Sequence, residues 1–157
     1  MNLQLSNILN ADVILHNQRM LNSYCRWTGE ELIERKDPPK EQSEALFNAP
    51  FSVVSHGTEA DPVFKYGNKK ALELFEMTWE EFTKMPSRNS AEPVEQEVRA
   101  EFMAAVTKNG FVDNYEGVRI SSRGKRFLMK NAIVWNVLDE NGKYCGQAAT
   151  FYNQEYL

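Results

Sequence analysis

The sequence predicts an α+β fold in which helices cover one face of an antiparallel β-sheet. Apolar side chains alternate along residues 126–138, with Phe127, Met129 and Trp135 on one face, as in a half-buried strand. Asn141-Gly142 follows, and this pair tolerates the positive φ of a tight hairpin turn. Apolar residues recur at steps of three and four in two other segments, which predicts amphipathic helices. A sheet of this kind has one face to bury, and these helices supply the cover.

Residues 1–46 are predicted to form a helical extension. The helical stripe consists of Leu9, Val13, His16, Met20, Tyr24 and Trp27. Gly29 ends this pattern, and Pro38-Pro39 precedes a second short helix at residues 40–47. The segment has little apolar content of its own. We therefore expect its stripe to pack on the following domain or on a second copy of the chain, which would make a homodimer.

Residues 47–157 form the predicted domain, with five strands split two and three around helices. Residues 50–55 and 63–66 are the first two strands, and the last three run through residues 114–121, 126–138 and 143–152.

The helices between these strands have clear start and stop signals. Asn68 is a predicted N-cap, and Thr78 with Glu81 has the spacing of a capping box. A longer helix places Val94, Val98, Phe102 and Val106 on one face, and Asn109-Gly110 closes it.

Several ungapped stretches resemble the MEKHLA domain, a PAS-related family. They occur in the family's order as FSVVSHGTEADPVF (51–64), YGNKKAL (66–72), PSRNSAEP (86–93), GVRIS (117–121) and GQAATF (146–151). The N-terminal SYCRWTG (23–29) is similar to the leader of stand-alone bacterial members of the family. The resemblance implies a PAS-like five-stranded antiparallel sheet with a cavity lined by helices. The role it implies is sensory or regulatory, by analogy of fold.

Composition narrows the class of protein. The chain has 157 residues, a net charge of -4 and a pI near 5.3, which argues against a nucleic-acid-binding surface. No apolar run approaches the roughly 20 residues that span a bilayer, so we expect no membrane association. Cys25 and Cys145 have no motif spacing and are expected to be free thiols. A cytoplasmic location is expected.

Two PAS cofactors are not expected. Flavin-binding LOV domains use a cysteine within an Asn-Cys-Arg motif, and here Arg88-Asn89-Ser90 resembles that motif with Ser90 in the cysteine's place. A serine hydroxyl cannot form the thiol adduct with flavin. The LOV glutamine of the last strand would fall at Ala148, with Gln147 one place away and thus on the opposite face. Haem-binding PAS domains supply a histidine from the helix before the last three strands, and residues 94–108 contain none.

Asn131 and Trp135 are the first candidates for ligand binding. Asn131 interrupts the apolar face of the strand at residues 126–138, and a buried amide requires a hydrogen-bond partner, since leaving it unpaired costs about 1–3 kcal/mol. That partner could be a ligand, a backbone group or a buried water. Trp135 on the same predicted face could stack on a ligand or belong to the core.

His56, Ser90 and the arginines are further candidates. His56 lies in a predicted loop with acidic neighbours, where a loop role is favoured over a metal site. Ser90 contacts a ligand or is the N-cap of the following helix. Arg88 lies in the loop most particular to the resemblance and contacts a ligand or the loop itself. Arg119 and Arg126 flank one turn and either bind an anionic group or lie on the surface.

The favoured function is a non-enzymatic sensory domain that binds an unidentified small ligand between sheet and helices. The sequence carries no nucleophile motif, phosphate loop or metal-ligand spacing that would indicate an enzyme. The alternative is a ligand-free interaction module that dimerises through the N-terminal helix.

Overall fold

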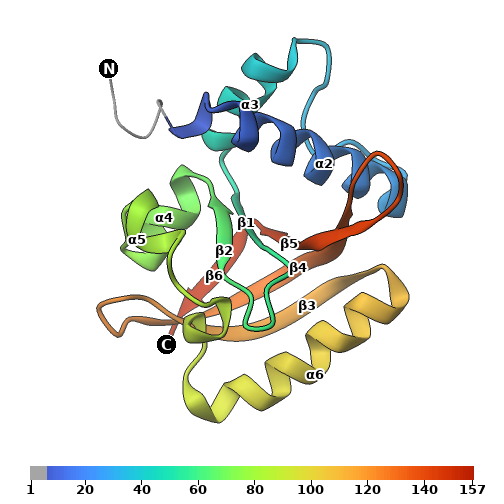
Figure 1. The fold of residues 1–157 in the computed structure, drawn as a ribbon. Helices are drawn as coiled ribbons and strands as arrows, with labels where there is room; N and C mark the ends of the chain where they lie inside the picture. Colours follow the sequence, from blue (N-terminus) through green and yellow to red (C-terminus); the bar gives the residue numbers. More distant parts are fainter. Residues whose placement is uncertain (1–6) are drawn as a thin grey trace.

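The computed structural model describes residues 7–157, and this part of the chain contains one antiparallel sheet with helices on both sides (Figure 1). The strand order is β2-β1-β5-β4-β3, and β6 pairs with β4 outside this path. The strands are β1 (Ser52–His56), β2 (Phe64–Gly67), β3 (Phe111–Ile120), β4 (Arg126–Leu138), β5 (Tyr144–Phe151) and β6 (Asn153–Tyr156). The helices are α2 (Ala11–Thr28), α3 (Pro39–Phe47), α4 (Lys69–Phe75), α5 (Trp79–Phe82), the 3₁₀ helix η1 (Ser87–Ser90) and α6 (Pro93–Asn109).

The predicted α+β architecture is confirmed, and β6 adds a sixth strand to the five expected. The chain turns at Tyr152 after β5, and β6 then pairs with the first part of β4 from Phe127 to Lys130. β5 pairs with the remainder of β4 from Ile133 to Leu138. β4 is therefore the longest strand and contacts β3, β5 and β6.

Local signals in the sequence define most helix ends. The side chain of Asn10 accepts a hydrogen bond from the Asp12 amide at the start of α2, and Gly29 ends that helix with a φ of 76°. The side chain of Asn68 caps α4, and Thr78 with Glu81 forms the predicted capping box of α5.

Neighbouring residues of β4 show that α2 and α6 cover opposite faces of the sheet. The Trp135 indole Nε1 donates to the Met20 carbonyl of α2 at 3.1 Å. The next residue, Asn136, donates from its side-chain amide to the Val106 carbonyl of α6, also at 3.1 Å. Successive side chains of a strand point to opposite faces. Helices α4 to α6 thus lie on the expected face, and the N-terminal extension covers the other one (Figure 1).

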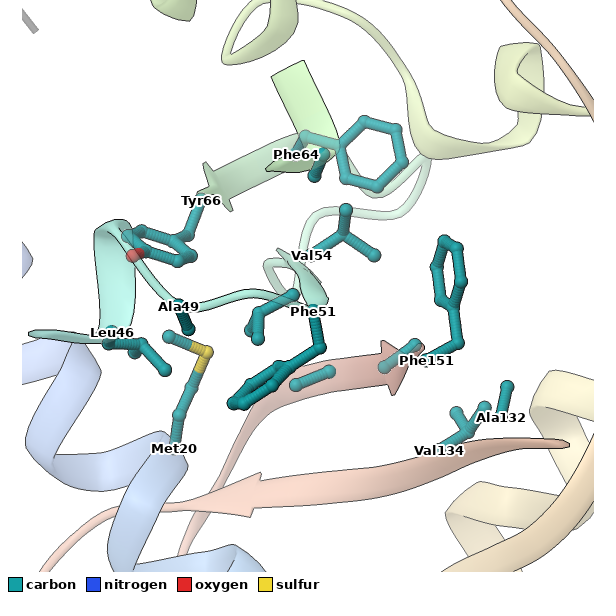
Figure 2. Packing of buried hydrophobic residues seen from close by; sticks show 14 of the residues in the cluster. Met20, Leu46, Ala49, Phe51, Val54, Phe64, Tyr66, Ala132, Val134 and Phe151 are labelled. Carbon is teal, nitrogen blue, oxygen red and sulfur yellow. The ribbon is translucent and has the colours of Figure 1, made fainter. Parts of the chain in front are cut away.

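The apolar stripe of α2 is buried within its own chain. Met20 and Tyr24 are buried, and the Tyr24 ring meets the Trp135 ring edge to face, 5.0 Å between centroids. Figure 2 shows Met20 extending toward Leu46, Ala49 and Phe51. The stripe was expected to pack either on the domain or on a second copy of the chain. It packs on the domain, so its buried part is not free to contact a second copy.

A β-bulge changes which residues of β4 face α6. The pairing of β3 with β4 shifts between Tyr115 and Gly117, so that Lys130 and Asn131 together oppose one residue of β3. Asn131 takes a φ of 54°, a left-handed conformation that asparagine tolerates better than most residues. Phe127 and Met129 before the bulge share a face with Val134 and Asn136 after it, because an extra residue reverses the alternation.

Candidate ligand-binding cavity

A cavity of about 40 Å³ lies between the sheet and the helices α4, η1 and α6. Strands β1, β4 and β5 form its floor, and β2 and β3 contribute one residue each. Its apolar wall consists of Val54, Phe64, Phe75, Met103, Met129, Val134, Ala148 and Ala149. Its polar wall consists of Ser55, His56, Ser90, Arg99, Arg119 and Gln147. This mixture of a broad apolar surface and a few polar groups is typical of small-molecule sites.

Two of the five predicted site residues line this cavity, His56 and Ser90. His56 is the last residue of β1 rather than part of a loop, and its Nδ1 lies 3.0 Å from the Gly57 carbonyl. That carbonyl can only accept, so Nδ1 carries the proton and Nε2 is left as an acceptor. Burial lowers the pKa of His56, which favours this neutral form.

Ser90 belongs to η1 and is not the N-cap of the following helix. Its hydroxyl donates to the Ser87 carbonyl at 2.7 Å, within the 3₁₀ turn. Helix α6 instead begins after Glu92, which makes no side-chain cap, with Pro93 in its first turn. The expectation of a cap was wrong because the 3₁₀ turn uses the hydroxyl before α6 begins.

Asn131 and Trp135 do not line the cavity. The expected burial of Asn131 is wrong, since its side chain is exposed at the bulge. Trp135 is fully buried but lies on the α2 face of β4, away from the cavity. Both errors have one cause, because the uninterrupted alternation assumed for β4 ignored the extra residue at Asn131.

Arg88 also lies outside the cavity wall. Its guanidinium Nε donates to the Asp61 carboxylate at 3.0 Å, and both side chains are about half exposed. The pair joins η1 to the loop between β1 and β2, which is the loop-structure alternative for this residue. Arg126 is likewise at the surface and pairs with Glu92.

Gln147 is a cavity residue that the sequence interpretation placed on the wrong face. Its side-chain amide donates to Asn136 Oδ1 at 3.1 Å, to Thr107 Oγ1 at 2.9 Å and to the Met103 carbonyl at 3.0 Å. It pairs across the sheet with Asn136, and both face α6. The expectation that Gln147 points away from the ligand-binding face was therefore wrong.

Together, Asn136 and Gln147 attach the C-terminal half of α6 to the sheet. Asn136 donates to the carbonyls of Val106 and Thr107 at 3.1 Å each, which are among the last carbonyls of the helix. Asn136 and Gln147 could have been recognised in the sequence as polar residues within two strands that are otherwise rich in apolar residues. Because the two strands are joined by a hairpin turn, their cross-strand pairing was in principle readable.

Helix α6 presents a different face to the sheet from the one predicted. Val94 and Val98 were expected to be buried, but they are 78% and 63% exposed. The inward stripe runs through Arg99, Phe102, Met103 and Val106, which is regular helical spacing with a cation at its first position. The number of apolar residues favoured the face that carries Val94 and Val98, because a charged residue such as Arg99 was not expected to point inward.

Arg119 is the second cation of the cavity wall and is only 4% exposed. Its guanidinium donates to the Tyr115 hydroxyl at 3.1 Å and to the Val118 carbonyl at 2.8 Å. Gly117 lies between these two side chains on the same face of β3, and a Cβ there would come within 2.6 Å of the Tyr115 hydroxyl. The Tyr115 ring in turn stacks on Phe102 of α6 at 3.7 Å. Tyr-x-Gly-x-Arg is therefore the local pattern that positions this arginine.

Arg99 lines the same cavity as Arg119. Its side chain is half-buried, and its Nε is enclosed without a hydrogen-bond partner. Burial, together with a smaller effect of the positive charge of Arg119, lowers the Arg99 pKa to about 10. Among the ion pairs of residues 7–157, none includes Arg99 or Arg119.

Other classes of site find little support in the described residues. Residues 7–157 contain no group of three or more His, Cys, Asp or Glu side chains arranged to hold a metal ion. The helices of this range include none with the length and apolar character needed to cross a bilayer. Cys25 and Cys145 are both free and lie outside the cavity wall.

The fold defines the class of protein as a PAS-like domain. The PAS domain of a Colwellia psychrerythraea protein superimposes with a TM-score of 0.63 at 16% identity, covering 77% of this chain and 98% of that one. A Light-Oxygen-Voltage domain studied with a flavin analogue gives 0.59 at 15% identity, covering 74% and 84%. The light-state dimer of the fungal blue-light photoreceptor Vivid gives 0.58 at 14% identity, covering 90% and 93%.

Sequence comparison places the chain within this class. The model of the MEKHLA domain family matches residues 14–156, which includes most of α2 and the whole sheet. The chain belongs to the MEKHLA domain family, as the sequence motifs indicated. None of the curated proteins matches it in sequence.

Proposed function

We propose that this protein is a non-enzymatic sensory or regulatory domain that binds a small ligand in the cavity between the sheet and α6. The observation that carries the proposal is the cavity itself, in which apolar walls surround a few polar groups at the centre of a PAS-like fold. The protein's own family and the photoreceptor domains of similar fold are consistent with a sensory role.

The size of the cavity sets a condition on binding. At about 40 Å³ it has room for a few water-sized molecules, well below the roughly 300–1,000 Å³ of typical ligand pockets. A larger ligand requires the N-terminal half of α6 to move outward. Val106 is the one buried residue among the 17 of this helix, so such a movement exposes little apolar surface.

A chain of hydrogen bonds links the cavity to α2 on the opposite face. Gln147 contacts the cavity with its side chain, and its carbonyl accepts from the Ser55 hydroxyl at 2.8 Å. His16 of α2 lies 3.0 Å from the same hydroxyl through its Nε2. A ligand that shifts Gln147 would therefore alter the position of α2, which gives the proposed sensor an output. The alternative of a dimerisation module is less favoured, because Met20 and Tyr24 of the α2 stripe are already buried against the domain.

The proposal is tested by filling the cavity. Ala149→Leu places a larger side chain in the wall, whereas Ala100→Leu makes the same change on the exposed side of α6. In a thermal-shift screen of small metabolites, a ligand at about 100 times its Kd should raise the Tm of the wild-type protein by about 5–10 °C. We expect Ala149→Leu to abolish that shift and Ala100→Leu to retain it.

Val54→Leu, a smaller change in the same wall, replaces Ala149→Leu if the latter does not fold. The proposal is wrong if every compound that stabilises the wild-type protein stabilises the filled variants equally. It is also wrong if no compound in a chemically broad screen stabilises the wild-type protein at all.

A further inference from the structure

The polar part of the cavity wall is cationic. Arg99 and Arg119 both line it, and no carboxylate of residues 7–157 forms an ion pair with either. The other polar groups do not balance this charge. His56 is neutral there, and the Gln147 amide hydrogens are already bonded to α6 and to Asn136.

Two cations that line one cavity without an anion are costly. A buried charge needs a partner of opposite sign, and two like charges raise each other's energy. Arg119 is held by neutral partners only, the Tyr115 hydroxyl and the Val118 carbonyl, and these use part of its donor capacity. Arg99 has an enclosed Nε that is not hydrogen-bonded. Such donors are suited to an acceptor that carries a negative charge.

We propose that the cavity binds an amphiphilic anion, with a carboxylate or phosphate head group between Arg99 and Arg119 and a short apolar body against Phe64, Met103 and Met129. This inference rests on the proposed function and adds the chemical class of the ligand. Guanidinium groups bind both kinds of head group through paired hydrogen bonds. Phe64, Met103 and Met129 belong to the apolar wall of the same cavity and would contact the rest of the molecule.

The test uses the full chain and a matched set of probes. Hexanoate and hexyl phosphate carry the two head groups, hexanamide is the neutral counterpart, and acetate and inorganic phosphate lack the apolar body. Binding is measured by calorimetry or by amide chemical shifts at constant ionic strength. We expect hexanoate or hexyl phosphate to bind at least tenfold more tightly than hexanamide. Affinity should rise about fourfold per methylene from acetate upward for as long as the outward movement of α6 admits the longer chain.

Arginine variants identify the groups responsible. Arg99→Gln and Arg119→Gln should each weaken binding of the anion about tenfold to hundredfold and leave hexanamide within about twofold. Arg123→Gln makes the same charge change in the exposed turn between β3 and β4 and should affect neither probe. Both test variants are expected to fold, because removing either arginine leaves no carboxylate unpaired.

The outcomes separate this inference from the proposed function. If hexanoate and hexanamide bind equally and Ala149→Leu blocks both, the cavity binds ligands but the anion inference is overturned. If anions bind with unchanged affinity to Arg99→Gln and Arg119→Gln, it is overturned as well. If no probe binds while the screen finds another ligand, the proposed function stands and the anion inference falls. Tighter binding of hexanoate than of hexyl phosphate, or the reverse, identifies the head group.

Discussion

At the scale of the residue, Asn131 has the largest effect on where the site lies. Its positive φ forms a bulge in β4, and beyond this bulge the side chains alternate between the two faces of the sheet in the opposite phase. Val134 and Asn136 therefore lie on the cavity face, and Trp135 lies on the α2 face. Asparagine is suited to this role because its side chain tolerates a left-handed backbone. The residue therefore acts through the backbone, and its exposed amide is not part of the cavity.

Substitutions at Asn131 should follow backbone preference. Asn131→Gly should change the free energy of unfolding by less than about 0.5 kcal/mol, whereas Asn131→Val should lower it by about 1–2 kcal/mol because a β-branched residue resists positive φ. Asn153→Val is the control, since Asn153 is exposed in β6 and is not among the positive-φ residues. Urea unfolding measures all three. Equal effects of valine at the two positions would contradict this account.

At the scale of the element, α2 is an integral part of the core. Met20 is fully buried, Trp27 donates from its indole to the Asn136 carbonyl at 2.9 Å, and the Ser23 hydroxyl accepts from the Leu138 amide at 2.8 Å. These contacts lie at the C-terminal end of β4, between Trp135 and Leu138. The helix thus covers the face of the sheet opposite the cavity at this end of the strand.

Truncating one side chain of α2 tests this role. Met20→Ala should lower the free energy of unfolding by about 2–5 kcal/mol, because it removes buried contacts and leaves a cavity. Leu15→Ala, on the side of the same helix that is 42% exposed, should change it by less than about 0.5 kcal/mol. If Met20→Ala altered the molecular mass in solution but not the stability, α2 would serve association between chains instead.

At the scale of the whole molecule, burial of histidine makes stability depend on pH. Burial is the main cause that lowers the His16 pKa from 6.5 to about 4, and the charges of Lys65 and Arg19 add to it. The unfolded chain therefore takes up this proton at a higher pH than the native protein does. The stability that His16 contributes is fully present above pH 6.5 and falls as the pH drops through the window from 6.5 to about 4, by about 3 kcal/mol from this residue alone.

Replacing His16 should flatten this profile. His16→Gln removes the titrating group. Between pH 7 and pH 4.5, the free energy of unfolding of this variant should therefore decrease by about 2–3 kcal/mol less than that of the wild-type protein. Urea unfolding across this range is the measurement. At pH 8, where His16 is neutral in both the folded and the unfolded chain, the difference in free energy of unfolding between the two proteins gives the loss of stability that does not depend on protonation. Parallel profiles between pH 6.5 and 4.5 would refute the assignment to His16.

The local parts of the fold were readable from the sequence. The caps at Asn68 and Thr78 and the end of α2 at Gly29 depend on residues a few positions apart, and each was predicted. The motifs at residues 51–64 and 86–93 gave the family. The amphipathic stripe of α2 correctly predicted the burial of His16, Met20 and Tyr24, but it missed Asn17, Leu21 and Ser23, which are also buried.

The cavity was predicted only in part. His56 and Ser90 lie in it, but Arg99, Arg119 and Gln147 carry most of its polar chemistry. The inward face of α6 could not be read from hydrophobicity, because Arg99 lies in the inward stripe at a position where an apolar residue is expected. A charged residue in such a stripe breaks the pattern that sequence interpretation relies on.

The sequence by itself determined the α+β class, the family and the ends of most helices, because these depend on neighbouring residues and on short motifs. Only the tertiary structure decided which residues share the cavity. The bulge at Asn131 depends on how β4 pairs with β3, and the rotation of α6 depends on how it docks on Asn136 and Gln147. Both are contacts between segments distant in the chain, and a shift of one residue in either moves a side chain to the opposite face.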